Sequence, residues 1–181
     1  MKVLLDTCVI YPTVMRQILL GVAKRGAYTP LWSARIIGEW QRAAAAKLGP
    51  DGAAQAEAEA LWLRQDWPKA EVTYPPSLEA RLWLPDPADT HVLAAAVAGH
   101  ADVIVTLNVK DFPRNILAEE SVSRADPDAF LLGLWQGNPE AMEHVAEAVL
   151  AEARRLSEGD WEMRALLKKA RLPRLAKALT R

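Results

Sequence analysis

Two short apolar runs read as buried strands, and each is followed by an aspartate. Asp6 comes directly after the run Val3–Leu5, and Asp111 comes shortly after Val103–Thr106. Apolar, partly β-branched runs of this length are typical of strands that are covered on both faces. If the two strands are parallel neighbours, their carboxyl ends share one edge of the sheet. Open α/β sheets bind their ligands at that edge, so the two aspartates mark a candidate site.

Predicted strands and helices alternate over roughly the first three quarters of the chain. The first strand is expected to continue to Ile10, and further strands are expected at residues 28–32, 71–74, 103–107 and 121–124. Helices are expected between them, at residues 13–26, 34–47, 53–66 and 90–98. This alternation predicts an α/β fold with a parallel, helix-covered sheet. Beyond it the pattern is helical, so we expect a domain over residues 1–135 and a helical C-terminal extension over residues 136–181.

Composition excludes several classes of protein. The chain has 181 residues, 51% of them hydrophobic, which is enough for one substantial core. A net charge of −1 argues against a protein dominated by nonspecific nucleic-acid binding. The single cysteine, Cys8, excludes an internal disulfide and favours a reducing compartment. The first apolar stretch is too short for a signal peptide and none is long enough for a membrane span, so we expect a soluble, cytoplasmic protein.

Two further acids join the candidate site. Glu39 lies in the helix predicted at residues 34–47, and Asp89 opens the helix predicted at residues 90–98. Carboxylates that converge at one sheet edge repel one another unless a cation lies between them. Hard divalent cations such as Mg²⁺ take oxygen ligands of this kind. Asp6, Glu39, Asp89 and Asp111 therefore predict metal-dependent chemistry, with phosphoryl transfer to water as the leading reaction.

Each acid also has an ordinary structural interpretation. Asp6 and Asp89 suit helix caps, and Asp111 suits a turn. Glu39 suits an exposed helix position paired with Arg35 one turn earlier. No acid is specific alone, but their shared placement at strand ends and helix starts favours a joint role.

Neighbouring side chains leave similar alternatives open. Asp86 lies between two prolines, where a turn is favoured over an outer-sphere metal contact. His91 could act as a general base, although a hydrogen-bonded structural role is favoured. Cys8 could be a nucleophile, but no triad motif supports this and packing is favoured.

Two further kinds of side chain could take part in binding. Tryptophans could stack on bases or simply pack in the core: Trp32, Trp40 and Trp83. Basic residues could hold phosphates or be solvated: Arg16, Arg35, Arg42, Lys110, Arg114 and the tail residues Arg164, Lys168, Lys169, Arg171, Arg174, Lys177 and Arg181.

Four features carry a family resemblance over about residues 1–132. They are Val3-Leu4-Leu5-Asp6-Thr7, Glu39 on the second helix, the segment from Asp86 to Ala96, and the segment from Ala101 to Pro113. With these features the chain resembles PIN-domain nucleases, including the VapC-like toxin ribonucleases of bacterial toxin–antitoxin pairs. The last segment is the most specific, because its Thr, Asn and Asp-Phe spacing is typical of the family.

The resemblance implies a three-layer α/β/α fold and a metal site of acidic residues. It carries the catalytic and metal-binding role onto Asp6, Glu39, Asp89 and Asp111. Thr106 and Asn108 would be supporting polar groups that orient ligands and waters. The chain departs from the family's common opening at Cys8, where Asn or Ser is usual, so any hydrogen bond from this position would be weak.

In function, the resemblance implies a Mg²⁺- or Mn²⁺-dependent endoribonuclease that hydrolyses RNA phosphodiester bonds. It further implies the toxin of a type II pair with a protein antitoxin, and a homodimer. One alternative is a catalytically silent PIN-like module that binds RNA or protein. Another is a phosphatase with Asp6 as nucleophile, but Cys8 stands where the partner acid of such an Asp-x-Asp pair belongs.

Overall fold

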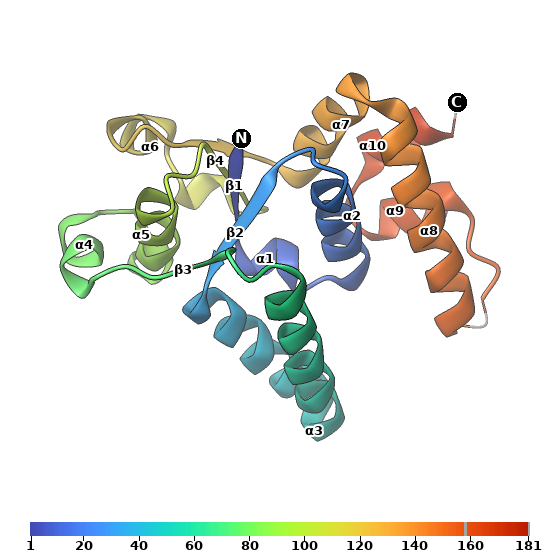
Figure 1. Cartoon of the computed structure of the whole chain (residues 1–181), viewed down its shortest axis with the longest axis horizontal. Helices are drawn as coiled ribbons and strands as arrows, with labels where there is room; N and C mark the ends of the chain where they lie inside the picture. Colours follow the sequence, from blue (N-terminus) through green and yellow to red (C-terminus); the bar gives the residue numbers. More distant parts are fainter. Residues whose placement is uncertain (158, 181) are drawn as a thin grey trace. The chain divides into compact units, whose positions relative to one another are not determined.

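The structure, a computed structural model, describes residues 1–157 and 159–180 (Figure 1). These residues group into two compact units, each built from two separate stretches of chain. The sheet unit contains Met1–Tyr11 and Thr29–Ala125. The helical unit contains Pro12–Tyr28 and Asp126–Arg181. The predicted division of the chain at residue 135 stays a prediction.

Five parallel strands form the sheet, in the order β3-β2-β1-β4-β5. The strands are β1 (Lys2–Leu5), β2 (Thr29–Ser33), β3 (Glu71–Val72), β4 (Val103–Val105) and β5 (Ser123–Ala125). Val3 in the central strand lies opposite Pro30 on one side and Val103 on the other. From β1 the chain continues to β2 and β3 on one side of the sheet, and then returns to β4 and β5 on the other side. The strand order therefore reverses between the neighbours β1 and β4. The predicted parallel sheet is confirmed.

Helices connect the strands of the sheet unit. They are α1 (Thr7–Ile10), α3 (Ala34–Asp66), α4 (Pro76–Arg81), α5 (Thr90–Ala98) and α6 (Arg114–Glu119), with short 3₁₀ turns η1 (Pro87–Asp89) and η2 (Val109–Asp111). Crossovers between parallel strands are right-handed, and the sheet is traversed in opposite directions by the β2–β3 and β3–β4 connections. Helices α3 and α5 therefore cover opposite faces, which gives the predicted three-layer α/β/α arrangement.

The first strand is shorter than the sequence predicts. It ends at Leu5, and α1 begins at Thr7, so the expected strand through Ile10 is wrong. The Asp6 side chain accepts a 2.7 Å hydrogen bond from the backbone N–H of Thr7 and caps this helical turn. Val9 and Ile10 are fully buried, and buried apolar residues fit a strand and a packed helical turn equally well.

Helix α3 folds back on itself. A straight helix of 33 residues would span about 50 Å. Its ends, however, flank the neighbouring strands β2 and β3, in which Trp32 is paired with Glu71. The reversal occurs at Gly49, whose φ of 69° and ψ of −157° interrupt the helix just before Pro50 (Figure 1). The predicted break between two helices is thus present as a sharp bend.

Helices alone form the second unit. They are α2 (Thr13–Lys24), α7 (Pro127–Gly137), α8 (Pro139–Ser157), α9 (Met163–Lys169) and α10 (Pro173–Leu179). Helix α2 packs closely on α8, because a Cβ atom added at Gly21 would lie 2.5 Å from Val145 Cγ1. The buried Asp128 carboxylate accepts hydrogen bonds from the first backbone N–H groups of α10, at Arg174 and Leu175.

The C-terminal extension is helical, as predicted. Of its apolar residues, Val145, Val149, Leu166 and Leu167 are buried, Trp161 is only partly buried and Ala148 is exposed. Two residues of this extension, Glu158 and Arg181, lie outside the described residues. Within residues 1–157 and 159–180, no helix combines the length and the apolar character that crossing a membrane would require.

Candidate metal centre

The candidate site lies at the carboxyl ends of β1 and β4, where the strand order reverses. Asp6 follows β1 and Thr106 follows β4. The Asp6 backbone N–H donates a 3.2 Å hydrogen bond to the carbonyl of Val105, which keeps the two strand ends in register at this edge. Asp6 is only 6% exposed and Thr106 is fully buried. The predicted meeting of the two strand ends is confirmed, and it places a buried carboxylate at the switch point of the sheet.

Three donors surround the Asp6 carboxylate. The Thr106 hydroxyl donates to Oδ2 at 2.7 Å, and the Thr7 backbone N–H donates to Oδ1 at 2.7 Å. The Cys8 thiol donates to Oδ2 at a longer distance of 3.3 Å. Hydrogen bonds to the charged form offset the cost of burying a carboxylate. Asp6 therefore caps α1 and lies at the strand edge at the same time, so the two interpretations of this residue are compatible.

Cys8 is a neutral thiol. Burial, followed by the charge of Asp6, raises the pKa of Cys8 to about 12. Its sulfur also accepts a 3.3 Å hydrogen bond from the Leu107 backbone N–H. Nucleophilic attack by cysteine requires the thiolate, which is scarce at neutral pH with such a pKa. The thiol serves here as a weak donor to Asp6, and the nucleophile alternative finds no support.

Three carboxylates come together beside this edge. One oxygen from each of Asp86, Asp89 and Asp111 lies within 4.8 Å of the others. Asp86 precedes the turn η1 and Asp89 ends it, after helix α4, and Asp111 ends the turn η2, after strand β4. Oxygen ligands of one divalent cation lie about 2.1 to 2.5 Å from the ion and hence up to about 5 Å apart. The spacing of the three carboxylates fits a single hard cation.

The Asp89 carboxylate has fewer hydrogen-bond partners than its position requires. It precedes α5 but makes no side-chain capping hydrogen bond, so the cap interpretation does not account for it. Its Oδ2 atom is buried and has no hydrogen-bond partner among the described residues. Burial, followed by the charges of Asp6, Asp86, Asp111 and Glu39 in that order, raises the pKa of Asp89 to about 6. An oxygen left without a partner in a crowd of negative charge suits a metal ligand.

The structure is compatible with both interpretations of Asp86, the turn and the metal contact. Its Oδ1 atom accepts a 2.9 Å hydrogen bond from the Ala88 backbone N–H, which forms the favoured turn. It also belongs to the group with Asp89 and Asp111. Its place in this group makes Asp86 a candidate metal ligand, and whether it binds the ion stays a prediction.

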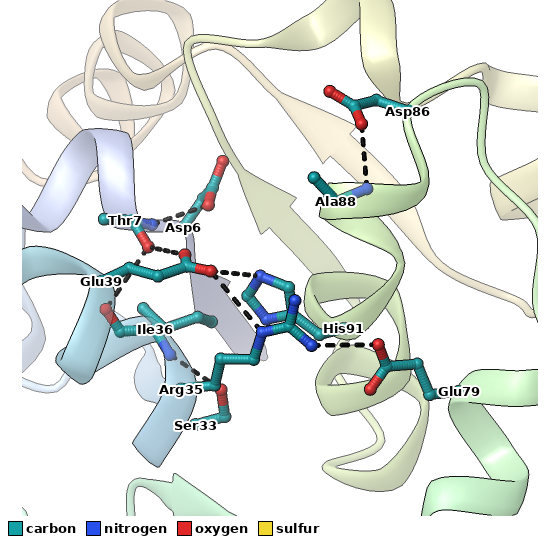
Figure 2. A network of polar contacts seen from close by, with 10 residues as sticks. All are labelled: Asp6, Thr7, Ser33, Arg35, Ile36, Glu39, Glu79, Asp86, Ala88 and His91. Carbon is teal, nitrogen blue, oxygen red and sulfur yellow. Dashed lines mark hydrogen bonds and ion pairs between the residues drawn. The ribbon is translucent and has the colours of Figure 1, made fainter.

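Glu39 lies outside the three-acid group and is held by protein donors (Figure 2). Its Oε2 atom accepts a 2.8 Å hydrogen bond from the Thr7 hydroxyl. Its Oε1 atom lies 2.9 Å from His91 Nε2 and 3.6 Å from Arg35 Nε. Arg35 in turn contacts Glu79 at 3.1 Å. The sequence suggested the Arg35 pair, but contacts between α1, α3, α4 and α5 carry no local sequence signal.

The two supporting residues differ in what they contribute. The Thr106 hydroxyl joins Asp6 to the chain beyond β4, because it also accepts a 2.9 Å hydrogen bond from the Asn108 backbone N–H. Asn108 contributes that backbone group, and its side chain is exposed. A direct hydrogen bond to Asp6 thus supports the role proposed for Thr106, whereas the role of the Asn108 amide stays a prediction.

The candidate RNA contacts separate by exposure. Trp32 and Trp40 are buried in the core of the sheet unit, whereas Trp83 is 65% exposed and lies three residues before Asp86. Among the candidate basic residues of this unit, Arg35, Arg42, Lys110 and Arg114 are exposed, and Arg35 is paired with Glu39 and Glu79. Arg16 belongs to the helical unit and is buried. Trp83 is therefore the tryptophan of the three that remains available to a base.

Comparison with known proteins gave two findings. Residues 2–110 match the family model of the PIN domain, a range that holds Asp6, Glu39, Asp86 and Asp89 and ends one residue before Asp111. A Mycobacterium tuberculosis protein named "Putative ribonuclease VapC50" is 52% identical over 44 residues. That match covers 24% of this chain and 26% of the relative, about a quarter of its length. No solved structure gave a significant match. Because the family match spans more than half of the chain, the protein belongs to the PIN-domain family.

Proposed function

We propose that this protein is a divalent-metal-dependent endoribonuclease that hydrolyses RNA phosphodiester bonds. One observation carries the proposal: Asp86, Asp89 and Asp111 gather beside the switch point of a PIN domain, and a buried Asp89 oxygen there has no hydrogen-bond partner within residues 1–157 and 159–180. The group combines an excess of negative charge with ligand atoms at coordination spacing. A bound Mg²⁺ or Mn²⁺ would offset that charge.

In this proposal Asp6, Glu39, Asp89 and Asp111 form the catalytic centre, with Asp86 as a further candidate ligand. When bound, the metal supplies Lewis acidity, which lowers the pKa of a bound water and shields charge on the phosphate. Asp89 and Asp111 would hold the ion, and Asp6, fixed by Thr106, would present a third carboxylate at the same edge. Water adds to phosphorus as the bond to the 3′ oxygen breaks, so the products carry a 5′-phosphate and a 3′-hydroxyl.

RNA is the proposed substrate because of the family and of the printed name of the relative. The same likeness supports the finer proposals of a type II toxin with a protein antitoxin, acting in the cytoplasm and as a homodimer. The exposed side chains of Trp83, Lys110 and Arg114 offer a base-stacking group and two phosphate partners near the acids in sequence. These groups suit a single-stranded substrate whose bases are accessible.

A catalytically silent binding module is the second candidate. In such a module the acids would no longer need to gather, yet Asp86, Asp89 and Asp111 remain within coordination distance. A phosphatase that uses Asp6 as nucleophile is less favoured, because both Asp6 oxygens accept protein hydrogen bonds and position 8 is a neutral cysteine.

The test is incubation of the full chain with end-labelled single-stranded RNA, with Mg²⁺, with Mn²⁺ and with EDTA. We expect cleavage with either metal, none with EDTA, and 5′-phosphate at the new ends. A matched preparation of Asp111→Asn guards against a contaminating nuclease. Melting temperatures recorded with and without metal separate the silent module, which would show neither cleavage nor a metal-induced shift.

A further inference from the structure

Glu39 is held from two sides by side chains of other elements. Thr7 on α1 donates to Oε2, and His91 on α5 lies 2.9 Å from Oε1 (Figure 2). The Glu39 side chain itself is 30% exposed, whereas the His91 side chain is only 1% exposed. A half-exposed glutamate on a helix surface would otherwise sample several rotamers. Its orientation is therefore set by a buried residue from another helix.

The 2.9 Å contact with Glu39 Oε1 indicates which nitrogen of His91 carries a proton. Because a carboxylate oxygen only accepts, the nitrogen facing it, Nε2, must be the donor. The other nitrogen, Nδ1, is buried without a partner among the described residues. In metal sites, groups behind a ligand commonly fix its orientation through bonds of this kind. His91 also follows Asp89 by two residues in the chain, so a single helix start carries an acid of the three-carboxylate group and the donor to Glu39.

We propose that His91 is a positioning residue, which aims the Glu39 carboxylate at the metal centre through its Nε2–H group. The proposal rests on the function proposed above and deepens it. His91 itself touches neither metal nor RNA. Thr7 holds the opposite oxygen, so the two donors clamp Glu39 between α1 and α5. The role belongs to the donor group and its position, and a side chain that places an N–H at the same point should replace it.

Mn²⁺ affinity, measured by titration calorimetry without RNA, provides the first readout. His91→Leu removes the donor from a buried site while keeping a similar volume, and we expect affinity to fall about 10-fold, the lower end for loss of an outer-shell partner. His91→Gln places an amide N–H near the position of Nε2 and should restore affinity to within about 3-fold. His144→Gln, at an exposed histidine on α8, is the matched control and should leave affinity unchanged.

A double-mutant cycle decides whether His91 acts through Glu39. In a Glu39→Ala background there is no carboxylate to position, so His91→Leu should cause no further loss of Mn²⁺ affinity. The second readout is RNA cleavage by the same set of variants. His91→Leu should lower kcat more than it raises KM. Thr7→Val removes the other donor and gives an independent arm if His91→Leu does not fold, as judged by its melting curve.

The outcomes separate this inference from the proposed function. Unchanged affinity in His91→Leu, or an equal loss with and without Glu39, overturns the positioning role while RNA cleavage by the wild type still supports the nuclease. Mn²⁺ binding with the expected cycle but without RNA cleavage would contradict the nuclease and leave the positioning role standing. A wild type that binds no Mn²⁺ would overturn both.

Discussion

The Thr106 hydroxyl donates a 2.7 Å hydrogen bond to Asp6 Oδ2 across the central strand pair of the sheet. Both residues follow their strands directly, and both are buried. The contact joins the two strand ends. It also offsets part of the cost of burying the Asp6 carboxylate at this edge. It makes the orientation of Asp6 depend on the neighbouring strand.

Replacing Thr106 with Val tests this contact. The shape is kept, but Asp6 Oδ2 is left with the Cys8 thiol as a weak donor. We expect the free energy of unfolding to fall by about 1–3 kcal/mol, the cost of a buried polar group that loses its partner. RNA cleavage should fall as well. Thr106→Ser keeps the donor and should stay close to the wild type in urea unfolding and in activity; an equal loss in both variants would point to packing instead.

Asp89 predicts a dependence of stability on pH in the metal-free protein. Its pKa is raised from 3.8 to about 6 in the fold. Between these values the folded protein holds more protons than the unfolded chain, so stability falls as the pH rises. Asp89→Asn removes this group. The variant should melt above the wild type at pH 7, and the difference should vanish below about pH 4.

Thermal melting across pH 4 to 8 without metal measures this difference. Asp51→Asn, at an exposed position on α3, is the control and should follow the wild type throughout. The same titration predicts that Mn²⁺ affinity weakens as the pH falls below about 6, because protons compete for the carboxylate. A variant that gains nothing at pH 7 would mean that neither burial nor neighbouring charge raises the pKa of Asp89 in the fold.

The acids should act as one unit in catalysis. Asp6→Asn and Asp111→Asn each keep the shape of the side chain and remove one negative ligand. Each variant should fold normally. Its RNA cleavage rate should fall by more than the ~10–100-fold that is typical when a residue behind a metal ligand is replaced. The double variant should lose far less than the product of the two. Single-turnover cleavage at saturating Mg²⁺ measures this, and wild-type rates in Asp6→Asn would remove Asp6 from the centre.

Trp83 should contact a base of the bound RNA. It lies three residues before Asp86, which places the two Cα atoms at most roughly 11 Å apart. Stacking of a base on an aromatic ring contributes about 1–3 kcal/mol, so Trp83→Ala should raise KM about 5- to 150-fold with little change in kcat. Trp62 is exposed to almost the same degree, at 64% against 65% for Trp83, and lies on α3. Trp62→Ala is thus the matched control, and equal KM effects would exclude a specific role for Trp83.

Much of the fold follows from local pattern. Apolar runs mark β1 and β4, and Asp126-Pro127 and Asn138-Pro139 mark the starts of α7 and α8. The error at Val9 and Ile10 has a physical source: the cap at Asp6 ends the strand, while the apolar pattern continues unchanged through the turn. An apolar pattern predicts which residues are buried, but it does not distinguish a strand from a short packed helix.

The sequence predicted which acids are candidates for the site, but not how the structure holds them. Placement at strand ends singled out Asp6 and Asp111, and these positions do lie at the edge near the switch point. The sequence did not reveal that Asp86 joins Asp89, because its turn interpretation was sufficient by itself. Nor did it reveal that His91 and Thr7 hold Glu39 from two sides. Such contacts join helices that are far apart in sequence, so no local pattern records them.

The packing of α2 on α8 has a consequence for the order in which the chain can fold during synthesis. Gly21 leaves the ribosome long before Val145, the residue against which it packs. The face of α2 around Gly21 is therefore covered only once the last third of the chain has been made. Contacts of such high sequence separation form late and leave apolar surface open to aggregation or to chaperones in the meantime. Nascent chains that stall before α8 should be the species that chaperones retain.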